Sequence, residues 1–361
     1  MAHKKTVAVF FGGASSEHEV SLVSASSIIE NIPRDKYDVI LVGITKTGRW
    51  LCFDGNVGSV KDGSWEKHPG NRDAFISMNP EKPGLCITEN STVKIIHIDA
   101  AFPVLHGKNG EDGTIQGLFA LAGIPFVGCS VTASAVCMDK ILTNSVLDAV
   151  NIKQAKWFGF TSFDYNCGAE AILSKIESDL GYPCFVKPAN AGSSVGVGKA
   201  KNRSQLTECI KTAAEHDKRI LLEEAIDGIE VECSVLGNDE PIASVVGEIT
   251  PANEFYDYAA KYSSPDSILT IPAKIAEETS LKIREIAVNA YKALSCEGLS
   301  RVDFFVEKTT GEVLLNELNT MPGFTSISMY PKLFEKSGIP YPELLDRLIT
   351  LAVKRSGCID G

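Results

Sequence analysis

The chain opens with a regular alternation of apolar and polar segments. Residues 6–11 (TVAVFF) form a short continuous apolar run typical of a buried strand, and two glycines and a helical pattern from about 17 to 31 follow it. The series continues with apolar runs at 39–44 and 95–102 and a helical pattern at 114–122. Strands that alternate with glycine turns and helices predict a parallel sheet flanked by helices. We expect the polar stretch at 54–91 to consist mainly of loops.

The rest of the chain divides into two further units. The second unit combines helical patterns and short apolar strands, at 134–149, 168–180, 183–188, 195–200 and 219–224. The third unit contains two neighbouring strands, 298–306 and 313–323, and ends in an amphipathic helix at 341–354. A chain of 361 residues is long enough for two or three domains. We predict three, at 1–128, 129–224 and 225–361, in an α/β fold with α+β character in its second and third parts.

Composition and charge narrow the class of protein. The chain is 44% hydrophobic and 22% charged, which is ordinary for a soluble globular enzyme. No apolar run is long enough to cross a membrane, and the basic start lacks the apolar region of a signal peptide. A net charge of −11 argues against nucleic acid and anionic membranes as partners. The ten cysteines are scattered without a CxxC pair, which argues against zinc and indicates a reducing cytosol.

A glycine-rich loop follows a lysine at the end of a predicted strand. Lys187 precedes PANAGSSVGVGKA, in which glycines at 192, 196 and 198 let the backbone approach a ligand closely. The loop lacks the G-K-[ST] of a Walker A motif, and a strand rather than a helix comes after it. It therefore suggests a flap over a triphosphate, although an ordinary hairpin turn would produce the same pattern.

Two groups of acidic residues add to this picture. Residues 223–226 end one strand and Glu230 opens the next, where a strand edge can bind adenine and a carboxylate can bind ribose, unless these are ordinary surface acids. On the last two strands, Asp303 and Glu317 interrupt apolar runs, and Asn319 shares a strand face with Glu317. Three oxygen ligands on one sheet face suit Mg²⁺, although a solvated strand face is the simpler alternative.

The motifs, taken in order, resemble a known family. Lysine, glycine flap, adenine strand and Asp…Glu-x-Asn hairpin are similar to the ATP-grasp fold. The segments GGASSEHEVSL, LHGKNGEDGTIQG, MDK, FYDYAAKY and NTMPGFTSISMYPKL resemble the D-alanine–D-alanine ligase family over nearly the whole chain. The resemblance implies a three-domain ATP-grasp fold in which two domains enclose ATP, with residues 250–271 as a lid. It also implies a cytoplasmic homodimer with D-alanine and ATP as small-molecule substrates.

The implied reaction proceeds in two steps. ATP phosphorylates the carboxylate of one D-alanine, and the amine of a second attacks the acyl phosphate to give D-alanyl-D-alanine, ADP and phosphate for peptidoglycan synthesis. The implied cofactor is Mg²⁺, two ions per site, with Mn²⁺ as the alternative. Two other functions stay open: a sister ligase that makes D-alanyl-D-serine or D-alanyl-D-lactate, and a nucleotide-binding regulatory module without turnover. The lid motif AAKY and the later SISMY fit a dipeptide-forming enzyme.

The resemblance also assigns roles to individual residues. The residues expected to bind ATP are Lys140, Lys187, Ser194, Glu223, Glu224, Ile226 and Glu230. The metal ligands are Asp303, Glu317 and Asn319, and the oxyanion donors are Arg301 and the N–H of Gly323. Arg301 could instead be a structural ion-pair partner of Asp303 or Glu317.

The remaining roles concern the two D-alanines. His106 is expected to line the first subsite, with a hydrogen-bonded loop histidine as the alternative. Ser328, Met329 and Lys261 are expected to receive the second carboxylate. Glu19, linked to Ser193 and Tyr262, is expected to face the ammonium of the first D-alanine. Ser16 and Glu19 also match a helix capping box, which alone would explain both residues.

Overall fold

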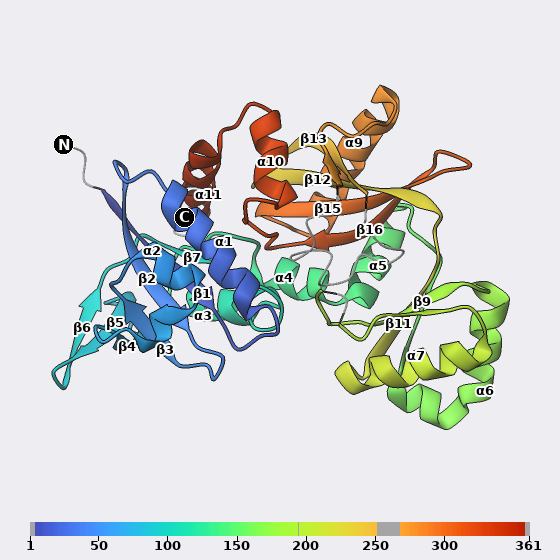
Figure 1. The fold of residues 1–361 in the computed structure, drawn as a ribbon, viewed down its shortest axis with the longest axis horizontal. Helices are drawn as coiled ribbons and strands as arrows, with labels where there is room; N and C mark the ends of the chain where they lie inside the picture. The colour runs from blue at the N-terminus through green and yellow to red at the C-terminus, as the bar shows by residue number, and fades with distance from the viewer. Residues whose placement is uncertain (1–3, 194, 251–267, 358–361) are drawn as a thin grey trace.

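The computed structural model describes residues 4–193, 195–250 and 268–357, and within them the chain builds three β-sheets in succession. Figure 1 shows the first sheet and its helices at the left, the second at the lower right and the third at the upper right. Each sheet lies inside one of the three predicted domain ranges. Some of the expected site lies outside the described residues: Ser194, Lys261, Tyr262 and residues 251–267 of the predicted lid.

The first sheet is parallel only at its centre. Its strand order is β6-β5-β4-β3-β2-β1-β7, and β1 pairs in parallel with β2 and β7. The strands are β1 (Lys5–Gly12), β2 (Tyr37–Ile44), β3 (Trp50–Phe53), β4 (Arg72–Ser77), β5 (Gly84–Glu89), β6 (Thr92–Ile96) and β7 (Ala100–Pro103). The side chains of β1 are buried on both faces, as expected for a central parallel strand with a continuous apolar sequence.

The antiparallel half of this sheet corrects two predictions. The stretch at 54–91 is not mainly loop, because it contains α2 (Val57–Lys61), β4 and β5. The single strand predicted at 95–102 is two strands, β6 and β7. The side chains of β6 are nearly all exposed, and those of β4 alternate in burial, so these strands lack the continuous apolar runs of the centre.

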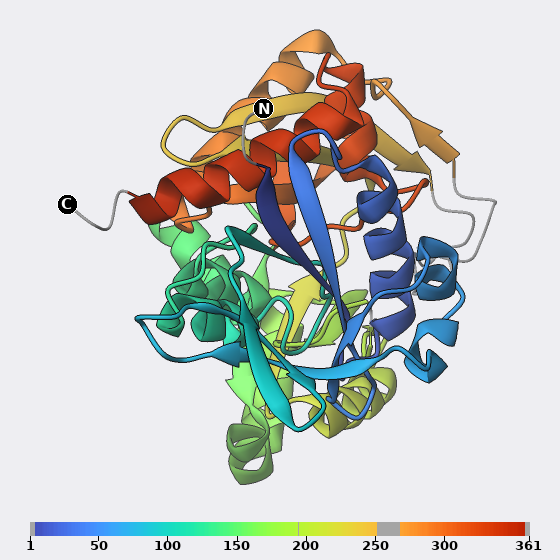
Figure 2. The same ribbon diagram turned by 90° about the vertical axis from the view of Figure 1, so that its left-hand side faces the viewer.

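Helices cover both faces of the first sheet, and one of them comes from the far end of the chain. The helix α1 (His18–Asn31) lies on one face and α3 (Thr114–Leu121) packs on the other. The C-terminal helix α11 (Tyr341–Gly357) joins α1, and its leucines share a core with Val7, Val9 and Phe11. Figure 2 shows α11 running across the first sheet beside α1. The last predicted domain therefore contributes to the core of the first.

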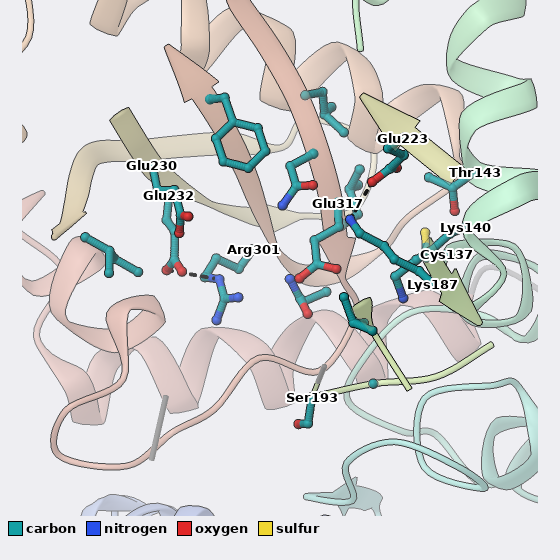
Figure 3. A pocket seen from close by; sticks show the side chains of 18 of the residues that line it. Cys137, Lys140, Thr143, Lys187, Ser193, Glu223, Glu230, Glu232, Arg301 and Glu317 are labelled. Carbon is teal, nitrogen blue, oxygen red and sulfur yellow. Dashed lines mark ion pairs between the residues drawn. The ribbon is translucent and has the colours of Figure 1, made fainter. Parts of the chain in front are cut away.

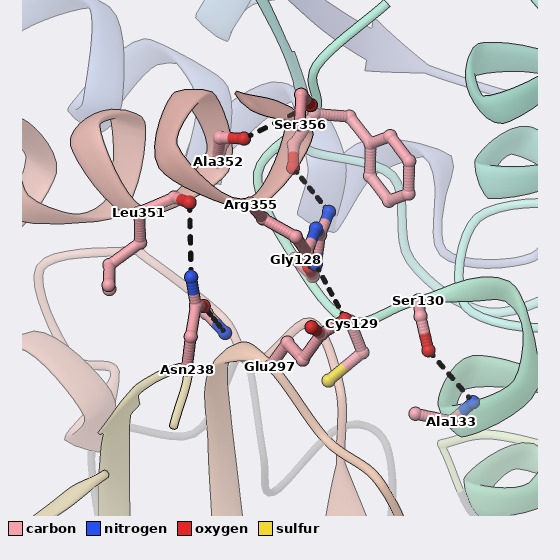
Figure 4. Close-up of polar contacts among 12 residues, drawn as sticks. Gly128, Cys129, Ser130, Ala133, Asn238, Glu297, Leu351, Ala352, Arg355 and Ser356 are labelled. Atoms are coloured by element: carbon pink, nitrogen blue, oxygen red, sulfur yellow. Dashed lines mark hydrogen bonds and ion pairs between the residues drawn. The ribbon is translucent and has the colours of Figure 1, made fainter. Parts of the chain in front are cut away.

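A polar cluster holds the end of α11 in place (Figure 4). The guanidinium of Arg355 donates to the carbonyl oxygens of Gly128 at 2.8 Å and Phe126 at 2.9 Å, and pairs with Glu297 at 3.2 Å. The amide of Asn238 donates to the carbonyl of Leu351 at 3.2 Å. The bonds to Gly128 and Phe126 join the C-terminal helix to the connection that leaves the first predicted domain.

The second sheet is antiparallel, with the order β10-β9-β11-β8. Its elements are β8 (Trp157–Thr161), α6 (Ser162–Asp179), β9 (Cys184–Pro188), β10 (Gly198–Ala200), α7 (Arg203–His216) and β11 (Arg219–Glu224). The segment of the predicted glycine flap lies between β9 and β10 in the chain. The helix predicted at 168–180 begins earlier, at Ser162. Gly168 is not its start but a kink inside it, where the backbone is non-helical.

The third sheet is also antiparallel and carries the acidic hairpin. Its order is β14-β13-β12-β15-β16. Its elements are β12 (Gly228–Gly237), β13 (Ile242–Thr250), β14 (Ile268–Thr270), α9 (Glu277–Ala293), β15 (Gly298–Glu307), β16 (Val313–Asn319) and α10 (Met329–Lys336). The helix predicted at 134–149 is two helices, α4 (Val131–Met138) and α5 (Lys140–Ala149). Both contribute to the core of the third sheet, although they belong to the second predicted domain.

The described residues contain no helix that is both long and apolar enough to span a membrane.

Candidate active site

A cavity of about 550 Å³ lies where the second and third sheets meet the first domain (Figure 3). Its walls come from β9, β11, β12, β15 and β16, from the flap, and from residues 320–323 after β16. Most of the predicted site residues line it. They are His106, Lys140, Lys187, Ser193, Glu223, Glu224, Ile226, Glu230, Arg301, Glu317, Asn319, Gly323, Ser328 and Met329.

The register of β15 and β16 places the predicted metal ligands together. Asp303 is paired with Glu317, and Arg301 with Asn319. The amide nitrogen of Asn319 donates to Asp303 Oδ2 at 3.0 Å. In this orientation the amide oxygen of Asn319 can act as a ligand for a cation. Asp303 is buried beside the residues that line the cavity. The register and this hydrogen bond bring the three residues together on the hairpin, and their role as metal ligands stays a prediction.

The chemistry of this set fits Mg²⁺. Among the described residues, no three His, Cys, Asp or Glu side chains form a metal cluster by themselves. A cation here would draw on two carboxylates and an amide oxygen, with water and phosphate oxygens as its other ligands. Mg²⁺ is commonly held in this way, through one or two carboxylates together with substrate phosphates.

Arg301 is fixed by two carboxylates. Its Nε and Nη2 atoms donate to the two oxygens of Asp303, both at 2.7 Å. Its Nε also lies 3.0 Å from Oε2 of Glu232, a buried residue on β12 (Figure 3). The structural ion pair that we considered for Arg301 thus exists with Asp303. It does not remove Arg301 from the cavity, whose wall includes this side chain.

Two lysines provide positive charge at the other end of the cavity. Lys187 forms an ion pair with Glu223, whose second oxygen accepts from the amide of Asn144 at 3.4 Å. Burial alone would lower the pKa of Lys187, but Glu223 and the further carboxylates of Glu317 and Glu230 raise it above its usual value. Lys140 Nζ donates to the carbonyl of Ala191 in the flap at 2.8 Å. Lysine cations near the flap are suited to bind phosphates.

The structure does not place Glu19 in the cavity. Its side chain is 61% exposed and pairs with Lys46, whose hydrogen bond lowers the pKa of the Glu19 carboxyl. Glu17 lines the cavity instead and is buried. A Cβ added to Gly107 or Gly192 would lie 2.6 or 3.4 Å from Glu17 Oε2, so this carboxylate lies between the His106 loop and the flap.

The helix start explains this difference. The capping-box prediction is wrong, because α1 begins at His18 with Glu17 as its N-cap and has no side-chain cap hydrogen bond. Residues 17 and 19 are separated by roughly half a turn, so one faces the cavity while the other faces solvent.

Two protein-family models match most of this chain. The model described as "D-ala D-ala ligase N-terminus" matches residues 6–129, and the one described as "D-ala D-ala ligase C-terminus" matches residues 146–350. The chain belongs to the D-alanine–D-alanine ligase family. Members of this family are ATP-dependent ligases with the ATP-grasp fold.

Individual relatives agree over nearly the full length. A D-alanine–D-alanine ligase of Acetivibrio thermocellus is 55% identical, with 98% of this chain and 97% of the relative covered. A solved D-Ala:D-Ser ligase, VanG of Enterococcus faecalis, has a TM-score of 0.88 and 43% identity over 97% of this chain and 100% of its own. The solved D-alanine–D-alanine ligase of Coxiella burnetii has a TM-score of 0.87 and 36% identity over 99% of this chain and 97% of its own.

Three residues that line the cavity of this ligase-family chain are not among those expected from its sequence. One is Glu17, since the sequence favours Glu19. Glu111 belongs to the quoted LHGKNGEDG motif, where a carboxylate among glycines was a usable signal. Glu232 gives no such signal, because its proximity to Arg301 depends on the pairing of β12 with β15.

The carboxyls of Glu17 and Glu111 lie close enough to influence each other. Desolvation, followed by repulsion from Glu17, raises the pKa of Glu111 to about 8. Burial lowers the pKa of His106 to about 4, so this imidazole is neutral near pH 7. His106 lines the cavity, and it is also the hydrogen-bonded loop histidine of the alternative, so its place in the first subsite stays a prediction.

Proposed function

We propose that this protein joins two molecules of D-alanine in an ATP-dependent reaction, and that the cavity between the second and third sheets is its active site. One observation carries the proposal: Lys140 and Lys187 line the same cavity as the hairpin residues Arg301 and Glu317. A ligase that activates a carboxylate must bring a triphosphate and a carboxylate together despite their like charges, and these groups provide the means.

The lysine end of the cavity suits the triphosphate. Lys187 and Lys140 would bind the α- and β-phosphates, and the flap with Ser193 and Ser194 would cover the γ-phosphate. Glu223, Glu224 and Ile226 lie at the end of β11, where backbone groups can bind adenine, and Glu230 can accept from ribose hydroxyls. Phosphoryl transfer depends mainly on such positioning and charge neutralisation.

The opposite end suits the first D-alanine. We propose that Glu17, rather than Glu19, faces the ammonium group of this substrate, because only Glu17 lines the cavity. Arg301 and the N–H of Gly323 would donate to the oxygen that gains charge when the second amine attacks. Preorganised donors of this kind typically contribute ~10²–10³ in rate each.

The second D-alanine would be bound near the start of α10. Ser328 and Met329 lie at the amino end of this helix, where backbone N–H groups favour a carboxylate. A Cβ on Gly323 would lie 2.7 Å from Ser328 Oγ, so a larger residue there would displace the Ser328 hydroxyl. Lys261 and Tyr262 complete this part of the proposal through the family resemblance.

Asp303, Glu317 and Asn319 would hold the Mg²⁺ ions, two per site, with Mn²⁺ as the alternative. Bound there, the ions would supply positive charge that offsets the charge of the phosphates. We further propose that the enzyme works as a cytoplasmic homodimer in peptidoglycan precursor synthesis, as the resemblance implies. Sedimentation of the purified chain would test the dimer.

The decisive experiment is product analysis with ATP, Mg²⁺ and equal concentrations of D-alanine, D-serine and D-lactate. We expect D-alanyl-D-alanine as the main product, with one phosphate released for each dipeptide. A main product that contains D-serine or D-lactate would favour the sister-ligase function, which the similarity to VanG keeps in view. No phosphate release with D-alanine would favour a binding module without turnover.

A further inference from the structure

The turn from Met321 to Phe324 is hydrogen-bonded to the first domain through three backbone groups. The carbonyl of Met321 accepts from His106 Nδ1 at 3.0 Å, and its N–H donates to Glu111 Oε1 at 3.2 Å. The N–H of Phe324 donates to Ser24 Oγ at 3.3 Å. The turn belongs to the C-terminal part of the chain, whereas all three side chains belong to the first domain.

The donors and acceptors of these hydrogen bonds are consistent with a single tautomer of His106. A carbonyl oxygen can only accept, so His106 carries its proton on Nδ1. Its Nε2 is then an acceptor for the hydroxyl of Ser24, which lies 3.2 Å away. The second oxygen of Glu111 accepts from the N–H of Gly107 at 2.7 Å, which ties the carboxyl group to its own loop. Both ring nitrogens of His106 thus have protein partners, and neither is left to transfer a proton to a substrate.

The side chains of the turn are also fixed. Met321 is 3% exposed and Phe324 is fully buried. The ring of Phe324 packs edge-to-face against Phe102 of β7, with centroids 6.3 Å apart. The hydroxyl of Tyr341 on α11 donates to the carbonyl of Phe324 at 3.3 Å. The turn is therefore anchored on both sides of Pro322 and Gly323, although these two residues themselves face the cavity.

We propose that Ser24, His106 and Glu111 form a clamp that positions the Met321–Phe324 turn, and with it the N–H of Gly323, relative to Arg301. These are positioning residues, since they act through the backbone of the turn. The inference rests on the proposed function, because it concerns the oxyanion donor of that reaction. A displacement of about 1 Å at such a donor can lower the rate about 10²-fold.

Two substitutions test the clamp, each with a matched control. Ser24→Ala removes the acceptor for Phe324. Its control is Ser26→Ala, since Ser26 is a buried serine of α1 whose hydroxyl donates within the helix to the carbonyl of Leu22. Glu111→Gln keeps the side-chain size but turns an NH₂ group toward one backbone N–H. Its control is Asp112→Asn, a neighbour that caps residues 109 and 114 of the same loop.

We expect Ser24→Ala and Glu111→Gln to lower kcat for dipeptide formation about 10- to 100-fold while KM for ATP changes less than about threefold. The double variant should lose little more than the worse single variant, because both act on one turn. Hydrogen exchange of the peptide that contains Met321 and Phe324 should be faster in both variants. The two controls should match the wild type in all three measurements.

Two results would overturn the clamp. The first is that Ser24→Ala and Glu111→Gln have the same kcat and the same hydrogen-exchange rate as the controls. The other is a parallel loss of kcat, ATP affinity and thermal stability, which would mean that the side chains only stabilise the fold. If the wild type itself made no dipeptide, the proposed function would fail, whereas the exchange measurement would still decide whether the clamp holds the turn.

Discussion

The guanidinium of Arg301 lies 3.0 Å from the carboxylate of Glu232, which reaches it from the neighbouring strand β12. The two side chains are 15% and 8% exposed, so solvent screens the pair only weakly. Asp303 contacts the same guanidinium from its own strand. Arg301 thus has one carboxylate partner within the proposed metal site and one that is independent of it.

We expect Glu232→Gln to lower turnover about 10-fold with little change in KM for ATP, because Arg301 loses a charged partner that fixes its orientation. Steady-state kinetics of dipeptide formation measure this. Arg301→Ala should be more severe, with a loss of about 10²-fold or more. In that background Glu232→Gln should add little.

The matched control for Glu232 is Glu248→Gln on the adjacent strand β13, where the carboxylate accepts from the N–H of Lys274. Near-normal turnover in Glu232→Gln, or an equal loss in Glu248→Gln, would show that Glu232 does not position Arg301.

Glu17 and Glu19 provide a paired test of the first-substrate site. Glu17→Gln should lower kcat/KM for D-alanine about 30- to 100-fold, because the ammonium group would lose a charge-assisted hydrogen bond worth about 2–3 kcal/mol. Glu19→Gln should be nearly neutral, since its exposed pair with Lys46 contributes little. Initial rates over a range of D-alanine concentrations measure both variants. The reverse order of effects would restore the prediction made from the sequence.

The parts of the site that sequence reasoning located are those fixed by short-range geometry. Asp303 and Glu317 lie on the two strands of one hairpin, so the sequence shows that they are near each other. Their direct pairing depends on a register shift between Asp303 and Phe304, which the sequence does not reveal. Lys187 directly precedes the flap, and here the local pattern suffices.

The features that the sequence does not reveal depend on the exact residue at which a helix begins, or on packing between segments far apart in the sequence. Whether Glu17 or Glu19 faces the cavity depends on the residue at which α1 begins, and a shift of one or two positions reverses the answer. Glu232 meets Arg301 only because β12 joins the sheet beside β15. The packing of α11 against α1 likewise joins the two ends of the chain, and leucine spacing along one helix does not identify its partner.

Substitution of the two acidic residues of the hairpin should weaken the binding and use of the metal ion. In Asp303→Asn and Glu317→Gln, a neutral amide replaces a charged ligand, so the Mg²⁺ concentration for half-maximal activity should rise, with partial recovery at high Mg²⁺. Direct titration with Mn²⁺, followed by electron paramagnetic resonance in the presence of ATP, should show weaker binding. Glu312→Gln at the end of the same hairpin, where the side chain pairs with Lys153, is the control. Unchanged metal binding in both variants would make the hairpin purely structural.

His106 predicts a pH dependence of stability. Burial holds its pKa at about 4, below the ~6.5 of an exposed histidine, so the unfolded chain binds a proton more readily than the folded one. The resulting stability is fully present above pH ~6.5 and is lost as the pH falls through 4, with a size on the order of 3 kcal/mol. His106→Asn keeps a donor for Met321 but cannot titrate. The melting temperature of the wild type minus that of this variant should therefore shrink as the pH falls from 7 to 4. A constant difference for His106→Asn would mean that His106 titrates alike in the folded and unfolded chain.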